Sequence, residues 1–252
     1  YLFANSLKDL SLFLKTYMKR GKIFILGAGS NTLFDDKIYD GVVIKLGKNF
    51  NNISKLNENL IISGSSCSDK KVSDFAMENS IEGFEFLSCI PGSIGGGIKM
   101  NAGCYGKEFK DIIVSVQVMD FNGNIYTISS SNISFKYRST NLPKDLIYLS
   151  GTFKGNLSDK AKIKSKIDEL KSKKELSQPL RVKTSGSTFK NPLEQSDKKV
   201  WELIKESVDI KAANEMFGDA KLSEKHCNFL INQHKASSKD MKNLINFIKE
   251  SV

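Results

Sequence analysis

The chain has few of the residues that build metal sites and disulfide frameworks. It contains four cysteines and two histidines among 252 residues. Cys67, Cys89, Cys104 and Cys227 form no pair with zinc-site spacing, and neither histidine lies near a cysteine pair. We therefore expect no metal site, and four unpatterned cysteines favour a reducing cytoplasm.

Long apolar runs are also missing. No stretch approaches the roughly 18–20 apolar residues that a transmembrane helix needs, so we expect no membrane partner. The composition, 40% hydrophobic and 26% charged, is typical of a globular protein, and the length suits two or three small domains. The chain starts at Tyr1, which leaves open a removed leader or a shortened N-terminus.

Arginine is scarce although the chain is basic. The net charge is +10, nearly all the basic residues are lysine, and arginine stands only at positions 20, 138 and 181. A basic protein can bind nucleic acid, but basic and aromatic residues do not alternate here as a platform for stacked bases. We interpret the charge as a compositional bias and expect no nucleic-acid partner. An isolated arginine among lysines can mark a need for the planar guanidinium fork.

Glycine, by contrast, is concentrated in two segments. The first, Gly27-Ala28-Gly29-Ser30-Asn31-Thr32, follows the apolar run at 23–26. The second, Pro91-Gly92-Ser93-Ile94-Gly95-Gly96-Gly97, leads to Asn101-Ala102-Gly103. Backbone without side chains can approach a flat or anionic ligand closely. The two segments predict a large cofactor with a phosphate end and a planar end; an ordinary β-turn and a tightly packed glycine loop are the alternatives.

Periodicity places these segments among strands and helices. It predicts helices at 6–20, 69–78, 158–177, 199–208 and 238–252, strands at 22–26, 41–46, 59–63 and 146–153, and a hairpin over 112–128. The residues after Thr32 do not read as a helix, so the dinucleotide fingerprint of strand, glycine turn and helix is incomplete. We expect a phosphate cradle made of loop N–H groups instead.

Three further segments could carry chemistry. A fixed guanidinium at Arg138 could stabilise an enolate or a carboxylate, and a surface salt bridge is the alternative. Ser187 lacks a His–Asp arrangement, which argues against a hydrolase triad, but a serine can pass a proton when its neighbours tune it. Lys225 could meet a phosphate, and a solvated hairpin charge is the alternative.

Together these motifs resemble the family of UDP-N-acetylenolpyruvoylglucosamine reductase (UDP-N-acetylmuramate dehydrogenase). Five ordered segments carry the resemblance, at 26–33, 83–106, 135–138, 186–192 and 220–232. It implies an α+β fold in which a two-part FAD-binding region, a small α/β lobe and a larger mixed lobe, precedes an α+β substrate-binding domain. We expect these parts at 1–46, 47–172 and 173–252.

The resemblance also implies residue roles. Gly27, Ala28, Gly29, Ser30, Asn31 and Thr32 would hold the FAD diphosphate, and Pro91, Gly92, Ser93, Gly95, Gly96, Asn101, Ala102 and Gly103 would line the isoalloxazine. Arg138 would stabilise the enolate and Ser187 would protonate it, with NADPH as the first reductant. Tyr137, Lys190, Asn191 and Lys225 would contact the UDP-sugar substrate.

Two features of the family place limits on the expectation. The short separation of Arg138 and Ser187, about fifty residues, is similar to the subgroup without an inserted substrate-covering loop. The family's N-terminal strand region and its C-terminal glutamate have no counterpart between Tyr1 and Val252, so we assign no residue as that acid and expect the ends to be incomplete. The expected protein is a cytoplasmic monomer. Another FAD-dependent oxidoreductase and a non-catalytic FAD-binding protein remain the alternatives.

Overall fold

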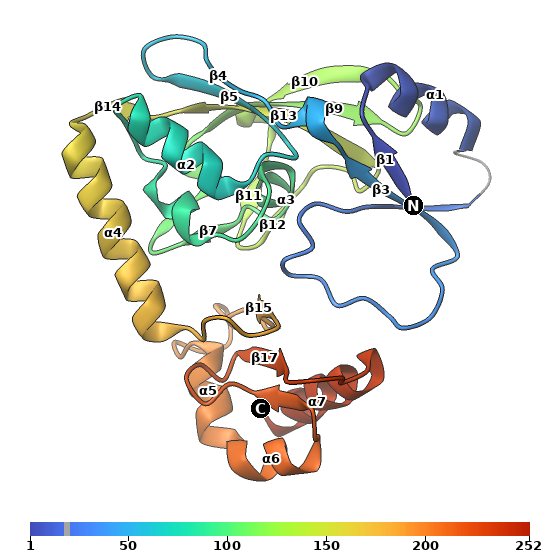
Figure 1. Cartoon of the computed structure of the whole chain (residues 1–252), viewed down its shortest axis with the longest axis vertical. Helices are drawn as coiled ribbons and strands as arrows, with labels where there is room; N and C mark the ends of the chain where they lie inside the picture. Colours follow the sequence, from blue (N-terminus) through green and yellow to red (C-terminus); the bar gives the residue numbers. More distant parts are fainter. Residues whose placement is uncertain (18–20) are drawn as a thin grey trace. The chain divides into compact units, whose positions relative to one another are not determined.

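The computed structural model describes residues 1–17 and 21–252 (Figure 1). These residues fall into two compact units. The first comprises Tyr1–Gly29 and Asp40–Ser172, and the second comprises Ser30–Tyr39 and Lys173–Val252. Residues 30–39, expected inside the first domain, therefore belong with the C-terminal segment.

A small parallel sheet begins the first unit. Its strands are, in order across the sheet, β1 (Leu2–Ala4), β3 (Gly41–Leu46) and β2 (Lys22–Ile25). Helix α1 (Leu7–Tyr17) confirms the predicted helix and starts where the Ser6 hydroxyl accepts the amide of Asp9. Its predicted continuation to residue 20 lies outside the described residues. Because the strands are parallel, the glycine turn after β2 lies at their carboxyl edge, the usual ligand-binding edge of such sheets.

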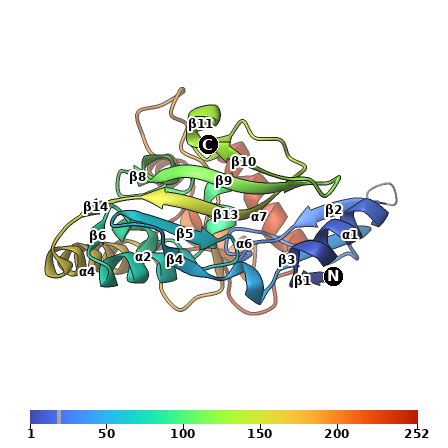
Figure 2. The same ribbon diagram turned by 90° about the horizontal axis from the view of Figure 1, so that it is seen from above.

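A five-stranded antiparallel sheet forms the larger lobe of the first unit (Figure 2). Its order is β10 (Ile125–Ser129), β9 (Ile113–Asp120), β13 (Leu146–Lys154), β5 (Leu60–Gly64) and β4 (Ile53–Lys55). The predicted hairpin is confirmed as β9 and β10. Its turn contains Gly123 at φ +81°, a conformation that residues with a side chain rarely adopt.

The two faces of this sheet bury different neighbours. One face packs on helices α2 (Asp69–Glu78) and α3 (Ile94–Lys99), and its core includes Ile61, Val72, Ala76, Ile94, Ile98, Val116, Tyr148 and Phe153. The other face packs on the parallel lobe, and its core includes Leu10, Leu14, Ile44, Met119, Ile147 and Leu149. Successive strand residues point to opposite faces. The two expected FAD-binding lobes thus pack against each other through this core and form one unit.

Short elements and one long helix complete the first unit. They are η1 (Lys48–Phe50), β6 (Ile81–Glu82), η2 (Glu85–Cys89), β7 (Gly103–Cys104), β8 (Lys107–Glu108), η3 (Phe109–Asp111), η4 (Ser130–Asn132), β11 (Phe135–Lys136), β12 (Ser139–Thr140), β14 (Asn156–Leu157) and the start of α4 (Lys160–Ser177). The predicted apolar stripe of α4 is confirmed, since Ile163, Ile167 and Leu170 are buried.

The second glycine-rich segment differs from the expected loop. Ile94–Lys99 forms α3, and none of its glycines has a positive φ. A Cβ on Gly97 would lie 2.3 Å from the ring of Phe109, and a Cβ on Gly95 would lie 2.9 Å from the Cβ of Ser65. Glycine is needed at both positions because neighbouring groups approach the helix closely. Gly95 and Gly97 therefore pack tightly against their neighbours.

We expect Gly97→Ala to lower the free energy of unfolding by about 1–3 kcal/mol, because the new methyl group overpacks a site whose neighbour, Phe109, is fully buried. Gly96→Ala is the matched control on the same helix. A Cβ there meets only Ser93 Oγ, at 3.5 Å, so this variant should be neutral or more stable by about 0.4–1 kcal/mol. Urea unfolding of the FAD-free protein measures both, and equal losses would contradict the packing argument.

The second unit has its own three-stranded sheet and core. The strand order is β15 (Thr184–Ser187), β17 (Phe229–Asn232) and β16 (Ala220–Leu222), all antiparallel. The helices are α5 (Val200–Ser207), α6 (Ile210–Met216) and α7 (Ser238–Ser251). Their apolar residues meet in a core that includes Val200, Ile204, Ala213, Leu222, Leu230, Leu244 and Ile248. The predicted helices at 199–208 and 238–252 are confirmed within one residue at each end.

Polar contacts explain why residues 30–39 belong to the second unit. The Ser238 amide donates to Asp36 Oδ2 at 2.6 Å, and the Asp36 amide donates to Ser238 Oγ at 3.1 Å. Lys242 Nζ lies 2.5 Å from Asp35 Oδ2 and holds the pKa of Asp35 below its ordinary value. Asp36 thus satisfies an amide in the first turn of α7, where a carboxylate is also favoured by the helix dipole.

Among the described residues, no helix is long and apolar enough to cross a bilayer. The same residues contain no group of three or more histidine, cysteine or acidic side chains placed to hold a metal ion.

Candidate functional site

The two glycine-rich segments come together in the first unit. A Cβ on Gly27 would lie 2.7 Å from Ser93 Oγ and 3.9 Å from Gly96 Cα. Gly29 has φ +73°, so the turn after β2 needs glycine at its first position for close approach and at its third for conformation. As predicted from the sequence, no helix follows this turn. Main chain from two separate elements therefore meets at the carboxyl edge of the parallel sheet.

The first glycine turn divides between the units. Gly27, Ala28 and Gly29 belong to the first, whereas Ser30, Asn31 and Thr32 belong to the second. The side chain of Asn31 does not stand alone, because its Nδ2 donates to the main-chain oxygen of Ser187 at 3.0 Å. The turn that was expected only to hold a diphosphate thus also contacts the segment of the predicted proton donor.

Buried polar side chains surround the start of α3. Ser93 Oγ, Ser65 Oγ and both carboxyl oxygens of Asp69 are buried and have no hydrogen-bond partner among the described residues. The Asp69 carboxyl fills the space beside Gly92, where a Cβ would lie 2.5 Å from Oδ2. A buried polar group without a partner is costly. This part of the unit therefore carries polar groups that a bound polar ligand or water can satisfy.

Burial alone raises the pKa of Asp69 to about 8, so at neutral pH the side chain is a neutral acid. The ordinary pKa of aspartate is about 3.9. Between these values the folded protein keeps a proton that the unfolded chain releases, so stability falls as the pH rises. The contribution of Asp69 to the free energy of unfolding is fully present below about pH 4 and is lost as the pH rises through about 8.

Asp69→Asn copies the neutral acid and should remove this pH dependence. Relative to the variant, the FAD-free wild type should lose stability with rising pH by at most about 1.4 kcal/mol per pH unit between roughly pH 4 and 8. Urea unfolding across that range measures the difference. Asp74→Asn on the same helix is the control, because Asp74 is partly exposed and paired with Lys70. Parallel stability curves for wild type and Asp69→Asn would reject the buried-acid interpretation.

Glu108 connects the predicted residues Asn101 and Arg138. Its Oε2 accepts the Asn101 amide at 2.9 Å and lies 3.0 Å from Lys110 Nζ, and its Oε1 lies 3.4 Å from Arg138 Nη1. Asn101 is fully buried and also donates to the carbonyl oxygen of Lys136 at 3.2 Å. Its side chain therefore links Glu108 to the main chain of Lys136.

Arg138 is held in a fixed orientation. It sits between β11 and β12 at φ +53°, a strained value for a residue with a side chain. Its Nη2 donates to the carbonyl oxygen of Gly103 at 2.7 Å, and its guanidinium lies 4.8 Å from the centre of the Tyr137 ring. Backbone strain of this kind is common at functional sites. Arg138 therefore forms an ion pair, the alternative that the sequence left open, and its guanidinium is also held by the Gly103 carbonyl and the Tyr137 ring.

Ser187 ends β15 beside an irregularity of the sheet. Thr184 pairs with Ile231 and Ser187 with Phe229, so the edge strand carries one extra residue between the pairs. Gly186, at φ +76°, supplies the conformation that this bulge needs. The Ser187 side chain is exposed, and bulges commonly direct a side chain out of the regular ladder.

Asn228 fixes the chain on the far side of Ser187. Its main-chain oxygen accepts the amide of Thr188 at 2.9 Å. Its side chain accepts the amide of Phe189 at 2.8 Å and donates to the carbonyl oxygen of Phe189 at 3.0 Å. Asn228 is almost fully buried. Sequence reasoning missed it, although a polar residue inside the apolar run before 232 was a usable signal.

The other predicted substrate residues have local partners. Asn191 Oδ1 accepts the amide of Val200 at 3.1 Å, at the start of α5. Lys225 Nζ donates to the carbonyl oxygen of Glu175 at 2.5 Å, near the end of α4, where a cation is favoured by the helix dipole. Lys190 is exposed on the segment that follows Ser187.

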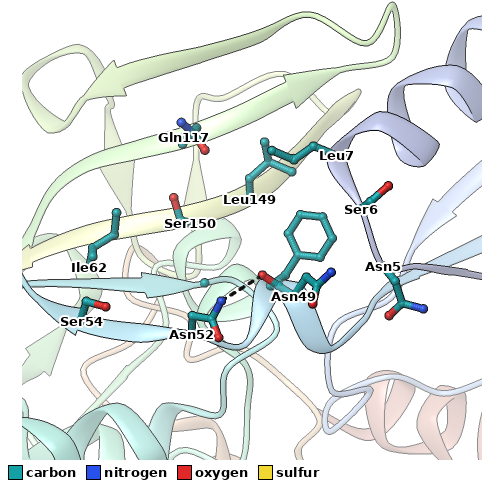
Figure 3. A pocket seen from close by; sticks show the side chains of 12 residues that line it. Asn5, Ser6, Leu7, Asn49, Asn52, Ser54, Ile62, Gln117, Leu149 and Ser150 are labelled. Carbon is teal, nitrogen blue, oxygen red and sulfur yellow. Dashed lines mark hydrogen bonds between the residues drawn. The ribbon is translucent and has the colours of Figure 1, made fainter.

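A separate pocket lies in the first unit on the face of the large sheet opposite α3 (Figure 3). Its volume is about 420 Å³, and its lining is uncharged, with Asn5, Asn49, Asn52 and Gln117 around the apolar Leu149. None of the predicted site residues lines it, so we do not place the cofactor there.

Comparison with known proteins decides the family. Residues 1–129 match the family model described as an FAD binding domain, and residues 178–252 match the C-terminal domain of UDP-N-acetylenolpyruvoylglucosamine reductase. The protein of that name from Pelagibacter ubique is 58% identical over 252 residues, which is 100% of this chain and 82% of the relative. The chain belongs to the UDP-N-acetylenolpyruvoylglucosamine reductase family.

Other members support the assignment and the fold. The relative of that name from Rickettsia typhi is 46% identical over 244 residues, covering 97% of this chain and 80% of its own length. The crystal structure of the UDP-N-acetylenolpyruvylglucosamine reductase from Thermus caldophilus matches with a TM-score of 0.83 at 27% identity, covering 99% of this chain and 87% of that one. The α+β fold class and the resemblance inferred from the sequence are confirmed.

The first unit fits FAD, the cofactor of this family. Its glycine turn at 27–29 offers a backbone nearly free of side chains at the carboxyl edge of a parallel sheet. Ser93 and Gly96 lie directly beside that turn, and the buried hydroxyls of Ser65 and Ser93 have no partner among the described residues. Small residues and unsatisfied polar groups at one place are the features that a dinucleotide needs.

Proposed function

We propose that this chain reduces the enolpyruvyl ether of UDP-N-acetylglucosamine to the lactyl ether of UDP-N-acetylmuramate, with FAD as its cofactor. NADPH supplies a hydride and solvent supplies a proton, so one carbon–carbon double bond is reduced and NADP⁺ is released. The match of residues 178–252 to the reductase's C-terminal domain carries the proposal, because FAD-binding domains serve many oxidoreductases. The reaction belongs to peptidoglycan precursor synthesis.

FAD, when bound, supplies the hydride-transfer chemistry that no side chain can perform. In the proposal, the main chain at 27–32 holds the diphosphate, and Pro91, Gly92, Ser93, Gly95, Gly96, Ala102 and Gly103 border the isoalloxazine. Asn101 is proposed to support this border of the isoalloxazine indirectly, through its hydrogen bond to Glu108.

Arg138 is proposed to stabilise the negative charge that develops on the enolpyruvyl carboxylate as the double bond is reduced. A guanidinium fixed before reaction stabilises such charge without reorganising. Its bonds to the Gly103 carbonyl and to Glu108 provide that fixation. Tyr137 supports it by stacking.

Ser187 is proposed to give its hydroxyl proton to the carbanionic carbon of the enolate. The hydroxyl must then regain a proton from solvent or from a neighbouring acid. Its exposure and its place at a bulge suit a residue that meets substrate. Lys190, Asn191 and Lys225 are proposed to contact the substrate, with Lys225 toward its diphosphate.

The four cysteines are free in the structure, which supports the proposal that the enzyme works in the reducing cytoplasm. We propose that it works there as a monomer, and sedimentation equilibrium of the FAD-loaded protein measures this.

The purified protein should be yellow, and anaerobic NADPH should bleach its flavin absorbance. Adding the enolpyruvyl UDP-sugar should then restore the absorbance and yield UDP-N-acetylmuramate. UDP-N-acetylglucosamine, which lacks the double bond, is the control and should restore nothing. A protein that binds FAD but never returns to the oxidised colour with substrate would be a non-catalytic binder. A colourless protein that takes up no added FAD would reject the proposal entirely.

A further inference from the structure

Asn31 contacts the peptide that carries the proposed proton donor. Its Nδ2 donates to the main-chain oxygen of Ser187 at 3.0 Å, and a Cβ on Gly186 would lie 3.6 Å from the same nitrogen. We propose that Asn31 is a positioning residue, which fixes the backbone of Ser187 and thereby sets the rate of proton transfer. The inference rests on the proposed function and assigns Asn31 a role other than holding the diphosphate.

The backbone at Ser187 needs such a contact because the sheet is irregular directly before it. One extra residue separates the pairs of Thr184 with Ile231 and of Ser187 with Phe229, so the regular ladder is interrupted directly before the serine. Gly186 within this bulge has the conformational freedom that glycine brings. A side-chain donor on the Ser187 carbonyl restricts rotation of the peptide that joins Ser187 to Thr188, directly after the bulge.

On the other side of Ser187 the chain is already fixed. Asn228 bonds the amide of Thr188 and both main-chain polar groups of Phe189, at 2.8–3.0 Å. Asn31 and Asn228 therefore bind the two polar groups of the Ser187–Thr188 peptide, Asn31 its carbonyl and Asn228 its N–H. Only Asn31 reaches it from a segment more than 150 residues away in the sequence.

Asn31 is itself carried by an anchored segment. Residues 30–39 are joined to the first turns of α7 by the paired hydrogen bonds of Asp36 with Ser238 and by the ion pair of Asp35 with Lys242. Both contacts lie in the same unit as Ser187. The segment thus presents the amide from a fixed base, which lowers the entropy lost when the contact to Ser187 forms.

Asn31→Asp tests the inference because it replaces the donor with acceptor oxygens and adds a negative charge. The carboxylate has nearly the same shape, but its oxygens repel the Ser187 carbonyl. Reduction of bound FAD by NADPH should stay within about twofold of wild type, while substrate-dependent reoxidation should slow by about 5- to 30-fold. The solvent deuterium isotope effect on reoxidation should rise, since proton transfer becomes more rate-limiting. The Kd of FAD, measured by fluorescence quenching, should change less than about twofold in Asn31→Ala, which keeps the main chain at 27–32 and adds no charge beside the diphosphate.

Asn214→Asp is the matched control in the same unit. Asn214 Nδ2 also donates to a main-chain carbonyl, that of Leu222, at 3.1 Å, and lies outside the proposed site. This variant should lower the Tm and leave both half-reactions and the isotope effect unchanged. Asn31→Ala provides a second test of the contact with a neutral side chain, and it should give the same pattern as Asn31→Asp.

A double-mutant cycle separates positioning from other roles. In the Ser187→Ala background, Asn31→Asp should slow reoxidation by less than about twofold more, because the group that Asn31 positions is gone. An undiminished effect in that background, or a Kd of FAD raised about tenfold or more by the neutral variant Asn31→Ala, would overturn the inference. Wild-type rates in both Asn31 variants would overturn it as well. The proposed function fails separately, when the wild type itself shows no substrate-dependent reoxidation.

Discussion

Ser187→Ala is expected to slow substrate-dependent reoxidation of the enzyme by about 10²–10⁴-fold, the usual contribution of a general acid. Reduction of bound FAD by NADPH should remain within about twofold of wild type, since that step needs no proton from Ser187. Alanine removes a single oxygen and keeps the peptide, so the Asn31 contact to the Ser187 carbonyl and the turn at Gly186 are retained. Stopped-flow absorbance of the flavin separates the two half-reactions.

Ser185→Ala is the control for Ser187→Ala. It removes the same atom from the same strand, two residues away, and should leave both half-reactions near wild type. If Ser187→Ala slowed both half-reactions equally, the loss would come from cofactor placement, and the role of proton donor would have to be withdrawn.

Arg138→Lys is expected to lower kcat by about 10²–10³-fold although the charge is kept, comparable to losing one donor to a developing anion. The guanidinium is oriented by separate bonds from Nη2 to the Gly103 carbonyl and from Nη1 to Glu108, and by stacking on Tyr137. An ammonium is a point charge on a flexible stem and cannot make the planar fork. Steady-state assays over a range of substrate concentrations give kcat and KM separately.

Arg181→Lys is the matched control for Arg138→Lys. Arg181 is an exposed arginine at a similar positive φ, +56°, so the control reproduces the backbone strain without the proposed site. It should leave kcat within about twofold of wild type. Turnover by Arg138→Lys at the wild-type rate would show that a positive charge suffices and would contradict the proposed role of the planar guanidinium.

Local sequence patterns predicted most of the secondary structure because they depend on neighbouring residues. The capped start of α1, the hairpin of β9 and β10, and the amphipathic stripe of α4 follow from residues within a few positions of one another. The strand and the glycine turn at 22–29 were predicted in the same way, because a short apolar run followed by glycines is typical of a strand that ends in a turn.

The glycine-rich segment at 91–97 shows where local reasoning fails. Glycine normally disfavours a helix, and the sequence therefore predicted a loop. The helix α3 forms because tertiary packing outweighs that propensity: Phe109 occupies the space where a side chain of Gly97 would be. Likewise, nothing near Asn101 indicated that its side chain would be buried on Glu108.

The sequence alone determined the family, the cofactor and the identity of the residues proposed to act, because these are set by short ordered motifs. Only the tertiary structure decided which neighbours each residue has. It joined residues 30–39 to α7, placed Asn31 on the Ser187 carbonyl, set Glu108 against Arg138 and buried the Asp69 carboxyl with no hydrogen-bond partner among the described residues. These contacts link positions as much as 202 residues apart. They arise from long-range packing and burial, which leave no periodic signal in the chain.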